Sequence, residues 1–270
     1  MTGQSSTHGI EMHPDRVIKT FESWGRGEHE QEWRALTLLA EYAPELAPLP
    51  LEAHLEAEPP VVVMSRLDGV PLRGLDVTSE QIEAMAEAIT TLHRAIPMRV
   101  LVDLAPSAWN PSVAIAKAQR LQAATPDLGG DPVVAEAFAA GSKWLVDSRL
   151  DRLMGEMTPV FGLSDSNLAN YLWDGKRIRL IDWEDSGRSD RAFELAEAVE
   201  HISQVDGIFD GPALLEHLDL SVTETARVLA FRRLFAFSWM CMLGPGSSFS
   251  ARNPYGTLER QAERLLGLLS

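Results

Sequence analysis

The chain has 270 residues, 45% hydrophobic and 23% charged, a balance that suits one large globular domain or two packed lobes. Its net charge of −15 and its pI of about 4.9 disfavour nucleic acid and anionic membranes as partners, because both require positive patches, and are compatible with a cationic substrate. The single cysteine, Cys241, excludes a disulfide framework and a cysteine-based metal cluster, and it indicates a reducing cytoplasm.

The N-terminal part predicts a small sheet and one helix. Its first residues contain no apolar segment typical of a secretory signal. Residues 9–21 read as two short strands around a His-Pro-Asp turn, and residues 27–43 repeat apolar side chains at helical spacing. The apolar run at 61–64 suits a buried strand, and the turn-rich stretch at 66–74 reads as a connector.

From Thr78 onward the pattern is helical. Thr78 or Ser79 is a plausible cap for the first of these helices, which extends to residue 96. Further helices are expected over 112–124, 132–154, 190–204, 212–218, 222–242 and 257–269. The most apolar stretch is broken by two arginines and is too short to cross a bilayer. We therefore expect an α+β fold, with a strand-containing part at 1–66 and a larger, mostly helical part at 67–270.

One β-hairpin is expected inside the helical part, around the Asp-Gly turn at 174–175. Folding the hairpin brings its ends together, so Asn170 and Asp182 can approach each other, with Asp165 in the loop before them. Carboxylate and amide oxygens suit Mg²⁺, and Asp165 is free to orient or deprotonate a hydroxyl. The competing interpretation is that all three residues satisfy backbone groups in turns. Their joint spacing favours the metal site.

The segment from Asp165 to Ala196 resembles the catalytic segment of the aminoglycoside phosphotransferase and choline kinase group, relatives of the protein kinases. DSNLAN is followed by LWDGKRIRLIDWED, and then Gly187, Asp190 and Glu194 match the spacing of the group's G-x-x-D-x-x-x-D-L-A pattern. The resemblance implies a two-lobe protein-kinase-like fold with a reduced N-terminal sheet. It also implies Mg²⁺-dependent transfer of the γ-phosphoryl group of ATP or GTP to a hydroxyl of a small acceptor.

The resemblance implies a role for each residue that matches this segment. Asp165 would accept the proton of the acceptor hydroxyl, and Asn170 and Asp182 would hold the Mg²⁺ that bridges the phosphates. Glu184 and Asp185 would either reach a second metal or line the mouth of the site.

The resemblance extends to the N-terminal part. RVIKTF is similar to the strand that carries the phosphate-binding lysine, here Lys19, and EWRAL is similar to the helix that carries its partner, here Glu32. VVVMSRLDGVPL is similar to the hinge whose backbone holds adenine, which would lie between Ser65 and Leu67. The residues expected to bind the nucleotide are therefore Lys19, Glu32, Ser65 and Leu67.

The chain departs from the family in two places. Leu163 and Ser164 stand where the family usually has His-Gly before the catalytic Asp. Only eighteen residues precede Lys19, so the stretch GQSSTHG at 3–9 would be either a shortened phosphate loop or a frayed terminus. Both departures leave open an alternative, a catalytically weak kinase-like protein that binds a nucleotide or metabolite as a sensor or a resistance-type sequestering protein.

The acceptor is the least determined part of the prediction. A cationic aminoglycoside or amino-sugar would suit an acidic cleft, whereas choline, homoserine, sugars and macrolides are acceptors within the same broad group. Acidic residues follow the hairpin, several of them expected on solvated faces or at caps: Asp190, Glu194, Glu197, Glu200, Asp206 and Asp210. Trp239 and Met240 would either wall the acceptor pocket or belong to the core.

Overall fold

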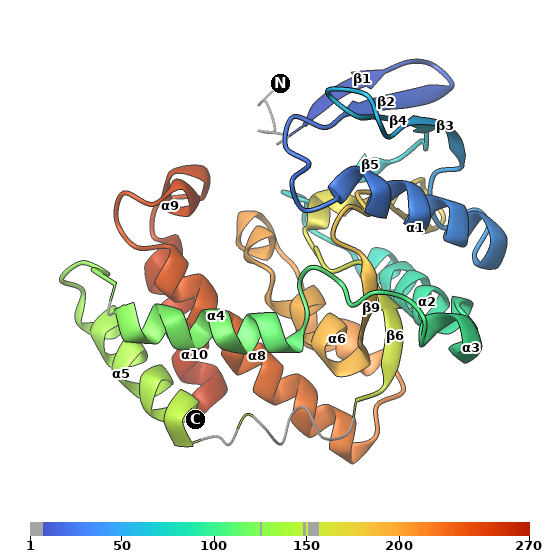
Figure 1. Ribbon diagram of the computed structural model, residues 1–270. Coiled ribbons are helices and arrows are strands. Elements are labelled where there is room, and N and C mark those ends of the chain that lie inside the picture. The colour runs from blue at the N-terminus through green and yellow to red at the C-terminus, as the bar shows by residue number, and fades with distance from the viewer. Residues whose placement is uncertain (1–7, 125, 148–149, 151–156) are drawn as a thin grey trace.

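The computed structural model describes residues 8–124, 126–147, 150 and 157–270, and it has two lobes (Figure 1). The smaller lobe contains an antiparallel sheet in the order β1-β2-β4-β3. Its strands are β1 (Gly9–Met12), β2 (Arg16–Thr20), β3 (Pro50–His54) and β4 (Val61–Ser65). Helix α1 (Glu28–Tyr42) packs against β3 and β4. The expected strands at 9–21 and 61–64 and the helix at 27–43 are confirmed.

Strand β3 was not expected from the sequence. It lies at the edge of the sheet, begins with Pro50, and its register with β4 shifts between Pro50 and Glu52. Proline cannot donate to a ladder and is tolerated at the first position of an edge strand. Because β3 is exposed along much of its length, it lacks the apolar pattern that would have predicted a strand.

The larger lobe is mostly helical, as expected. Its helices are α2 (Ser79–Ala95), α3 (Met98–Leu101), α4 (Pro111–Ala124), α5 (Pro132–Asp147), α6 (Arg191–Glu200), α7 (Gly211–Glu216), α8 (Val222–Met242), α9 (Ser248–Arg252) and α10 (Thr257–Leu269). The Thr78 side chain forms a capping box with Gln81 at the start of α2. Helix α6 ends earlier than expected and is followed by a 3₁₀ turn, η3 (Ile202–Asp206). The helix expected to reach 154 is described only to Asp147, because 148–149 and 151–156 lie outside the described residues.

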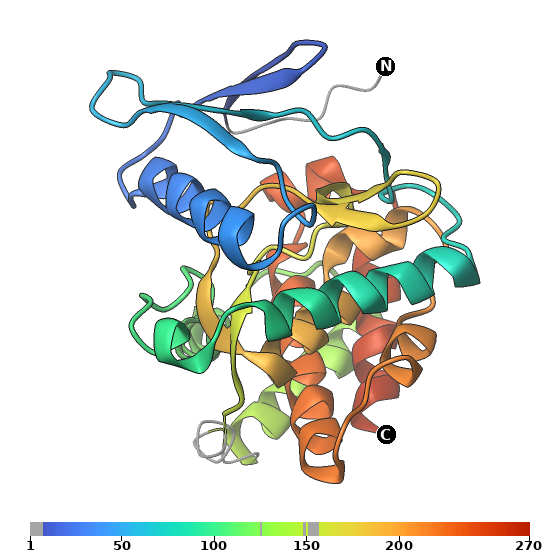
Figure 2. The ribbon, with the colours of Figure 1, turned by 90° about the vertical axis from the view of Figure 1, so that its right-hand side faces the viewer.

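Two small sheets in the larger lobe position the candidate site. The predicted hairpin is present as β7 (Tyr171–Trp173) and β8 (Ile178–Leu180), and β7 also pairs with β5 (Val70–Pro71), a short strand in the connector. Strands β6 (Pro159–Gly162) and β9 (Gly187–Asp190) form a second pair that the sequence did not predict. Figure 2 shows the hairpin between α1 and α2, where the lobes meet.

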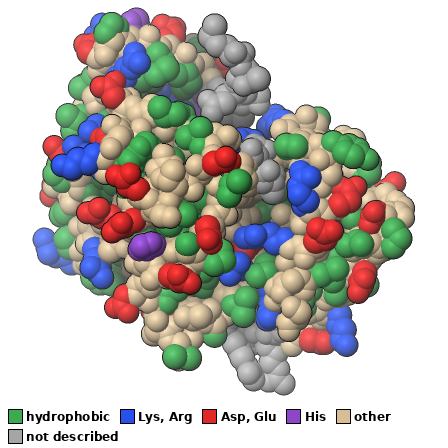
Figure 3. Space-filling model, turned by 180° about the vertical axis from the view of Figure 1, so that it is seen from behind, with side chains coloured by type: hydrophobic (Ala, Val, Ile, Leu, Met, Phe, Trp, Pro, Cys, Tyr) green, Lys and Arg blue, Asp and Glu red, His purple; other side chains and the backbone are tan. Residues whose placement is uncertain are grey.

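Charged side chains of both signs are mixed on one face of the molecule (Figure 3). On the face shown in Figure 3, acidic and basic groups are interspersed with apolar ones. Among the described residues, no helix combines the length and the apolar character that a membrane-spanning segment requires.

A buried ion cluster joins three helices of the larger lobe. Glu200, at the end of α6, is 2% exposed. It accepts a hydrogen bond from Arg232 Nε of α8 at 2.6 Å, and it pairs with Arg264 of α10. The Arg264 guanidinium also donates to the Val199 carbonyl at 2.8 Å. Glu200 therefore ties α8 and α10 to α6, the helix that follows the candidate site.

We expect Glu200→Gln to destabilise the protein by about 3 kcal/mol, because removing one member of a buried ion cluster leaves the remaining charges uncompensated. Chemical denaturation measures this loss. Glu263→Gln, an exposed position on α10, is the matched control and should change the free energy of unfolding by less than about 0.5 kcal/mol. Equal stability of the two variants would show that the cluster contributes nothing to the fold.

Candidate active site

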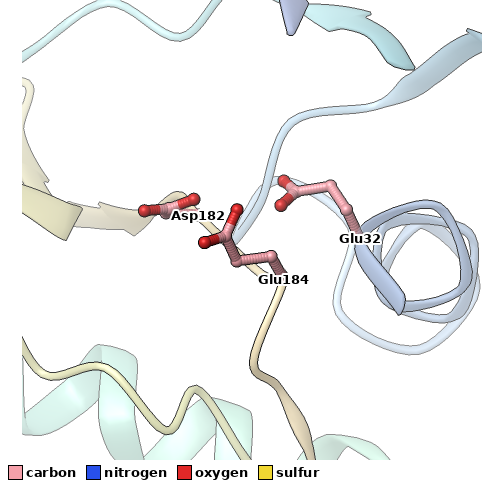
Figure 4. Close-up of side chains that lie close together, drawn as sticks. All are labelled: Glu32, Asp182 and Glu184. Atoms are coloured by element: carbon pink, nitrogen blue, oxygen red, sulfur yellow. The ribbon is translucent and has the colours of Figure 1, made fainter. Parts of the chain in front are cut away.

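The centre of the candidate site is the ammonium group of Lys19. Strand β2 buries Lys19 to 4% exposure, and its Nζ lies 2.9 Å from Glu32 Oε2, 2.5 Å from Asp182 Oδ1 and 2.8 Å from Glu184 Oε2. Figure 4 shows the three carboxylates turned toward one another, Glu32 from α1 and the other two from the segment after β8. Residues 163 positions apart thus meet where the lobes join.

Lys19 is held in its charged form by this arrangement. Burial alone would lower its pKa, but Glu32, Asp182 and Glu184 raise the pKa of Lys19 well above its ordinary value. Three facing carboxylates against one ammonium leave a negative excess. The cluster therefore favours binding of a further positive charge near Asp182, whose side chain is 38% exposed.

Glu32 also fixes the backbone that carries Asp182. Its Oε2 accepts a hydrogen bond from the Trp183 amide at 3.1 Å. The Trp183 ring is fully buried, stacks against Phe161 at 6.1 Å and donates through Nε1 to the Leu180 carbonyl. Asp182 lies between these anchors with a left-handed φ of 68°, and 38% of its side chain is exposed.

The two acidic residues that follow have separate partners. Glu184 lies 2.8 Å from His8 Nε2 as well as from Lys19, and 14% of its side chain is exposed. Asp185 pairs with Arg26 Nη1 at 2.9 Å, across from the loop before α1. Glu184 thus belongs to the lysine cluster, and Asp185 links the lobes. The stretch 3–7 of the candidate phosphate loop lies outside the described residues.

Asp165 lies in the loop after β6, and Asn170 ends the short 3₁₀ helix η2 (Leu168–Asn170) that directly precedes β7. Asn170 Nδ2 donates to the Asp165 carbonyl at 3.1 Å and to its Oδ2 at 3.2 Å, and the Asn167 amide donates to Asp165 Oδ1 at 3.2 Å. The Asn170 carbonyl accepts from the amide of Ile181, so Asn170 stands beside the residue that precedes Asp182. The hairpin therefore brings together the three residues of the predicted trio.

The environment of Asp165 favours its neutral form. Burial, and then the charge of Asp182, raise the pKa of Asp165 to about 7. Its side chain keeps 37% of its surface exposed, so solvent still reaches the carboxyl group. A carboxyl group with a pKa near neutrality, open to an incoming molecule, has the properties of a general base.

Leu163 and Ser164, which replace the expected His-Gly, are accommodated by packing and by Glu194. Leu163 is 2% exposed. Ser164 has a left-handed φ of 62°, and its amide and hydroxyl both donate to the Glu194 carboxylate at 3.2 Å. A Cβ at Gly162 would lie 2.3 Å from that carboxylate, so a larger residue there would have to displace the Glu194 side chain from Ser164. The loop is thus anchored on α6.

We expect Leu163→His to destabilise the protein and not to raise turnover, alone or with Ser164→Gly. A fully buried leucine contributes roughly 1.5 to 3 kcal/mol, and Ser164→Gly also removes the hydroxyl that binds Glu194. Thermal melts and turnover numbers measure both effects, with Leu163→Met as the volume-matched control. An unchanged melting midpoint together with a large gain in turnover would identify a degraded kinase loop instead.

The hinge has two of its amides engaged inside the small sheet. The Ser65 amide donates to the Leu49 carbonyl at 2.8 Å, and the Arg66 amide donates to the Asp15 carbonyl at 3.0 Å. The Leu67 backbone is next along the chain, where the polypeptide leaves β4 for the larger lobe. Adenine binding at Ser65 and Leu67 stays a prediction. In that prediction the backbone amide of Leu67 would be the donor to adenine.

Acidic residues after the hairpin are internal supports rather than solvated faces. Asp190 is fully buried, caps α6 and pairs with Arg227, Glu194 binds Ser164, and Glu200 binds two arginines. Glu197 is 4% exposed, and burial followed by the charge of Glu194 raises its pKa well above the ordinary value. The expectation of solvated faces is therefore wrong for Glu194, Glu197 and Glu200, whereas Asp190 is a cap, as expected. Asp210 is a cap, as expected, bonded to the Ala213 amide.

His201 lies next to Asp165 and was missed from the sequence. Its Nε2 is 3.4 Å from Asp165 Oδ1, and its ring packs edge-on against Trp239. Trp239, which is partly exposed, in turn packs edge-on against Phe249, whereas Met240 is fully buried in the core. His201 belongs to no recognised motif, so nothing in the sequence pointed to it.

Comparisons with known proteins identify a family and a fold. Residues 17–231 match the model of a family described as the phosphotransferase enzyme family. The search of curated proteins finds no match to the chain. Choline kinase LicA from Streptococcus pneumoniae has a TM-score of 0.62 at 16% identity, with 100% of this chain and 91% of that chain covered.

Two ligand-bound structures are similar to the same extent. Spectinomycin phosphotransferase, APH(9)-Ia, in complex with ADP and spectinomycin, has a TM-score of 0.61 at 12% identity, covering 99% of this chain and 87% of that chain. The GDP and kanamycin complex of APH(2")-IIia has a TM-score of 0.66 at 14% identity, covering 98% and 91%. At these identities the likeness establishes the kinase-like fold, which the sequence predicted.

Proposed function

The chain belongs to the phosphotransferase enzyme family, and from this premise we propose that it transfers the γ-phosphoryl group of ATP or GTP to a hydroxyl of a small acceptor in the cytoplasm. The observation that carries the proposal is the meeting of Lys19, Asp182 and Asp165 where the lobes join. In this proposal residues 1–66 bind the nucleotide, and residues 67–270 hold the catalytic loop, the metal site and the acceptor.

Each group has one task in the reaction. Lys19 holds the α and β phosphates, Glu32 holds Lys19, and the hinge backbone from Ser65 to Leu67 holds the adenine. The acceptor oxygen attacks the γ phosphorus, and the bond from that phosphorus to the β–γ bridging oxygen breaks. The hydroxyl proton passes to Asp165, and the nucleoside diphosphate leaves with the bond's electron pair.

The residues present fit a magnesium ion at Asn170 and Asp182. Asn170 uses its amide nitrogen on Asp165, which leaves its oxygen as the ligand atom. Asp182 gives one oxygen to Lys19, and more than a third of its side chain is exposed. An oxygen pair of this kind suits Mg²⁺, which would supply charge neutralisation to the phosphates. The set of Glu32, Asp182 and Glu184 is a poorer candidate, because Lys19 contacts all three carboxylates.

We propose a cationic acceptor such as an aminoglycoside or amino-sugar. The support is the net charge of −15 and the fold shared with a kanamycin complex and a spectinomycin complex. The buried carboxylates of α6 give no support, because they bind internal partners. The partly exposed Trp239 and Phe249 are the aromatic groups that we propose wall the acceptor. A catalytically weak binding protein is the competing function.

A panel of hydroxyl compounds with ATP and with GTP distinguishes the two functions. We expect Mg²⁺-dependent release of nucleoside diphosphate that rises on addition of one acceptor class, and we expect Asp165→Asn to abolish the acceptor-dependent part. Nucleotide binding without acceptor-dependent release for any compound would favour the binding protein.

The pH dependence of kcat/KM for the nucleotide should report Asp165. Its carboxyl is protonated below about pH 7 in the free protein, and only the ionised form accepts a proton, so kcat/KM should rise with pH through about 7. Flat profiles between pH 5 and pH 9 (roughly the range that spans this pKa) would contradict a titrating base here.

A further inference from the structure

His201 is held with one ring nitrogen facing the backbone and the other facing Asp165. It occupies the junction between α6 and η3 and is 8% exposed. Its Nδ1 accepts a hydrogen bond from the Ser203 amide at 3.2 Å, and the Ser203 hydroxyl lies 2.8 Å from the same nitrogen. A backbone amide can only donate, so Nδ1 is unprotonated and the ring proton is on Nε2.

The ring is neutral, and its proton on Nε2 faces the loop that contains Asp165. Burial, and then the nearby charge of Arg73, lower the pKa of His201 to about 3. Nε2–H therefore faces Asp165 Oδ1 at 3.4 Å as a donor. This distance exceeds that of an ordinary hydrogen bond, as is common for catalytic contacts before the ligands bind.

The surroundings fix the ring in place. His201 packs edge-on against Trp239 at 5.1 Å between centroids, and Trp239 packs edge-on against Phe249 at 5.6 Å. The Ser203 hydroxyl also accepts a hydrogen bond, at 2.9 Å, from the amide of Leu168, which lies between Asp165 and Asn170 in the sequence. The His201–Ser203 segment thus holds the loop through two contacts, one to the Asp165 carboxylate and one to the backbone.

We propose that His201 is the positioning residue for the base Asp165. Asn167 and Asn170 already donate to the Asp165 carboxylate, and the His201 Nε2–H, 3.4 Å from Oδ1, would be the third donor that fixes the plane of that group once the contact shortens. The remaining lone pair points to the acceptor hydroxyl. The inference rests on the proposed phosphotransfer, because positioning matters only if Asp165 acts as a base.

Two variants test the Nε2–H donor of His201 and its aromatic ring one at a time. His201→Phe keeps the ring against Trp239 but removes the donor, whereas His201→Gln keeps a donor near Nε2 without the ring. We expect His201→Phe to lower kcat roughly 10- to 100-fold with the nucleotide KM unchanged, and His201→Gln to recover most of it. In the Asp165→Asn background, His201→Phe should add no further loss. Equal losses in both single variants, or a kcat for His201→Phe within twofold of the parent, would overturn the inference.

A second measurement does not depend on turnover. Nitrogen NMR of the ring in the unliganded protein should show the Nε2–H tautomer, and Asp165→Asn should shift the Nε2 resonance while the Nδ1 resonance stays in place. A parent enzyme that phosphorylates no acceptor would refute the proposed function alone. An Nδ1–H tautomer, or an Nε2 resonance unaffected by Asp165→Asn, would refute the positioning contact alone.

Discussion

Asp165→Asn should lower turnover by about 10²- to 10⁴-fold and leave the affinity for Mg²⁺–nucleotide within a few-fold of the parent. The substitution keeps the shape of the side chain, and its amide oxygen still accepts from Asn167, but it cannot take the acceptor proton. Single-turnover kinetics and nucleotide titration calorimetry measure the two quantities. A large loss of turnover with little loss of nucleotide affinity is expected for a base that makes no contact with the metal.

The matched comparison is Asp182→Ala, which should weaken Mg²⁺–nucleotide binding as well as turnover. Asn170→Ala should weaken binding too, and it also removes the donor to the Asp165 carboxylate. If Asp165→Asn retained turnover within a few-fold of the parent, its assignment as the base would be wrong.

Lys19→Met should cost both nucleotide affinity and stability. The side chain fits the same space, but Glu32, Asp182 and Glu184 lose the ammonium group that lies within 3 Å of each of them. Breaking a buried ion cluster in this way costs about 3 to 5 kcal/mol, and the repelling carboxylates would also disfavour phosphates. Denaturation in urea and titration with Mg²⁺–ATP and Mg²⁺–GTP measure the two losses.

Lys176→Met is the control, because Lys176 is exposed in the turn of the hairpin. It removes the same charge from the protein as a whole and should leave both quantities unchanged. Comparable affinity in the Lys19 and Lys176 variants would show that Lys19 supports the fold without binding phosphate.

The catalytic segment was predictable because its structure is determined locally. The Asp174 carboxylate accepts from the amides of Lys176 and Arg177, and Gly175 takes the positive φ of 96° that the turn requires. Once that turn is fixed, the residues at its two ends must meet. The approach of Lys19 to Asp182, in contrast, came only from the family resemblance, since nothing local connects positions 163 residues apart.

The supports of the site could not be read from the sequence, because they depend on tertiary partners. From Ala192 to Glu200 every residue of α6 is buried, so the helix has no solvated face to which its carboxylates could be assigned. Their partners come from elsewhere along the chain: Arg232 on α8, Arg264 on α10, and Ser164 in the loop after β6. The pairing of β6 with β9 likewise joins short segments with no alternating pattern.

The central claim is that a hydroxyl acceptor receives the γ-phosphoryl group. Phosphorus NMR of the parent protein with Mg²⁺, ATP or GTP and the acceptor selected by the panel tests it directly. We expect a phosphomonoester resonance that grows in step with the nucleoside diphosphate and is absent with Asp165→Asn. Inorganic phosphate as the only new product besides the diphosphate, or unchanged nucleotide after prolonged incubation with every acceptor, would contradict it.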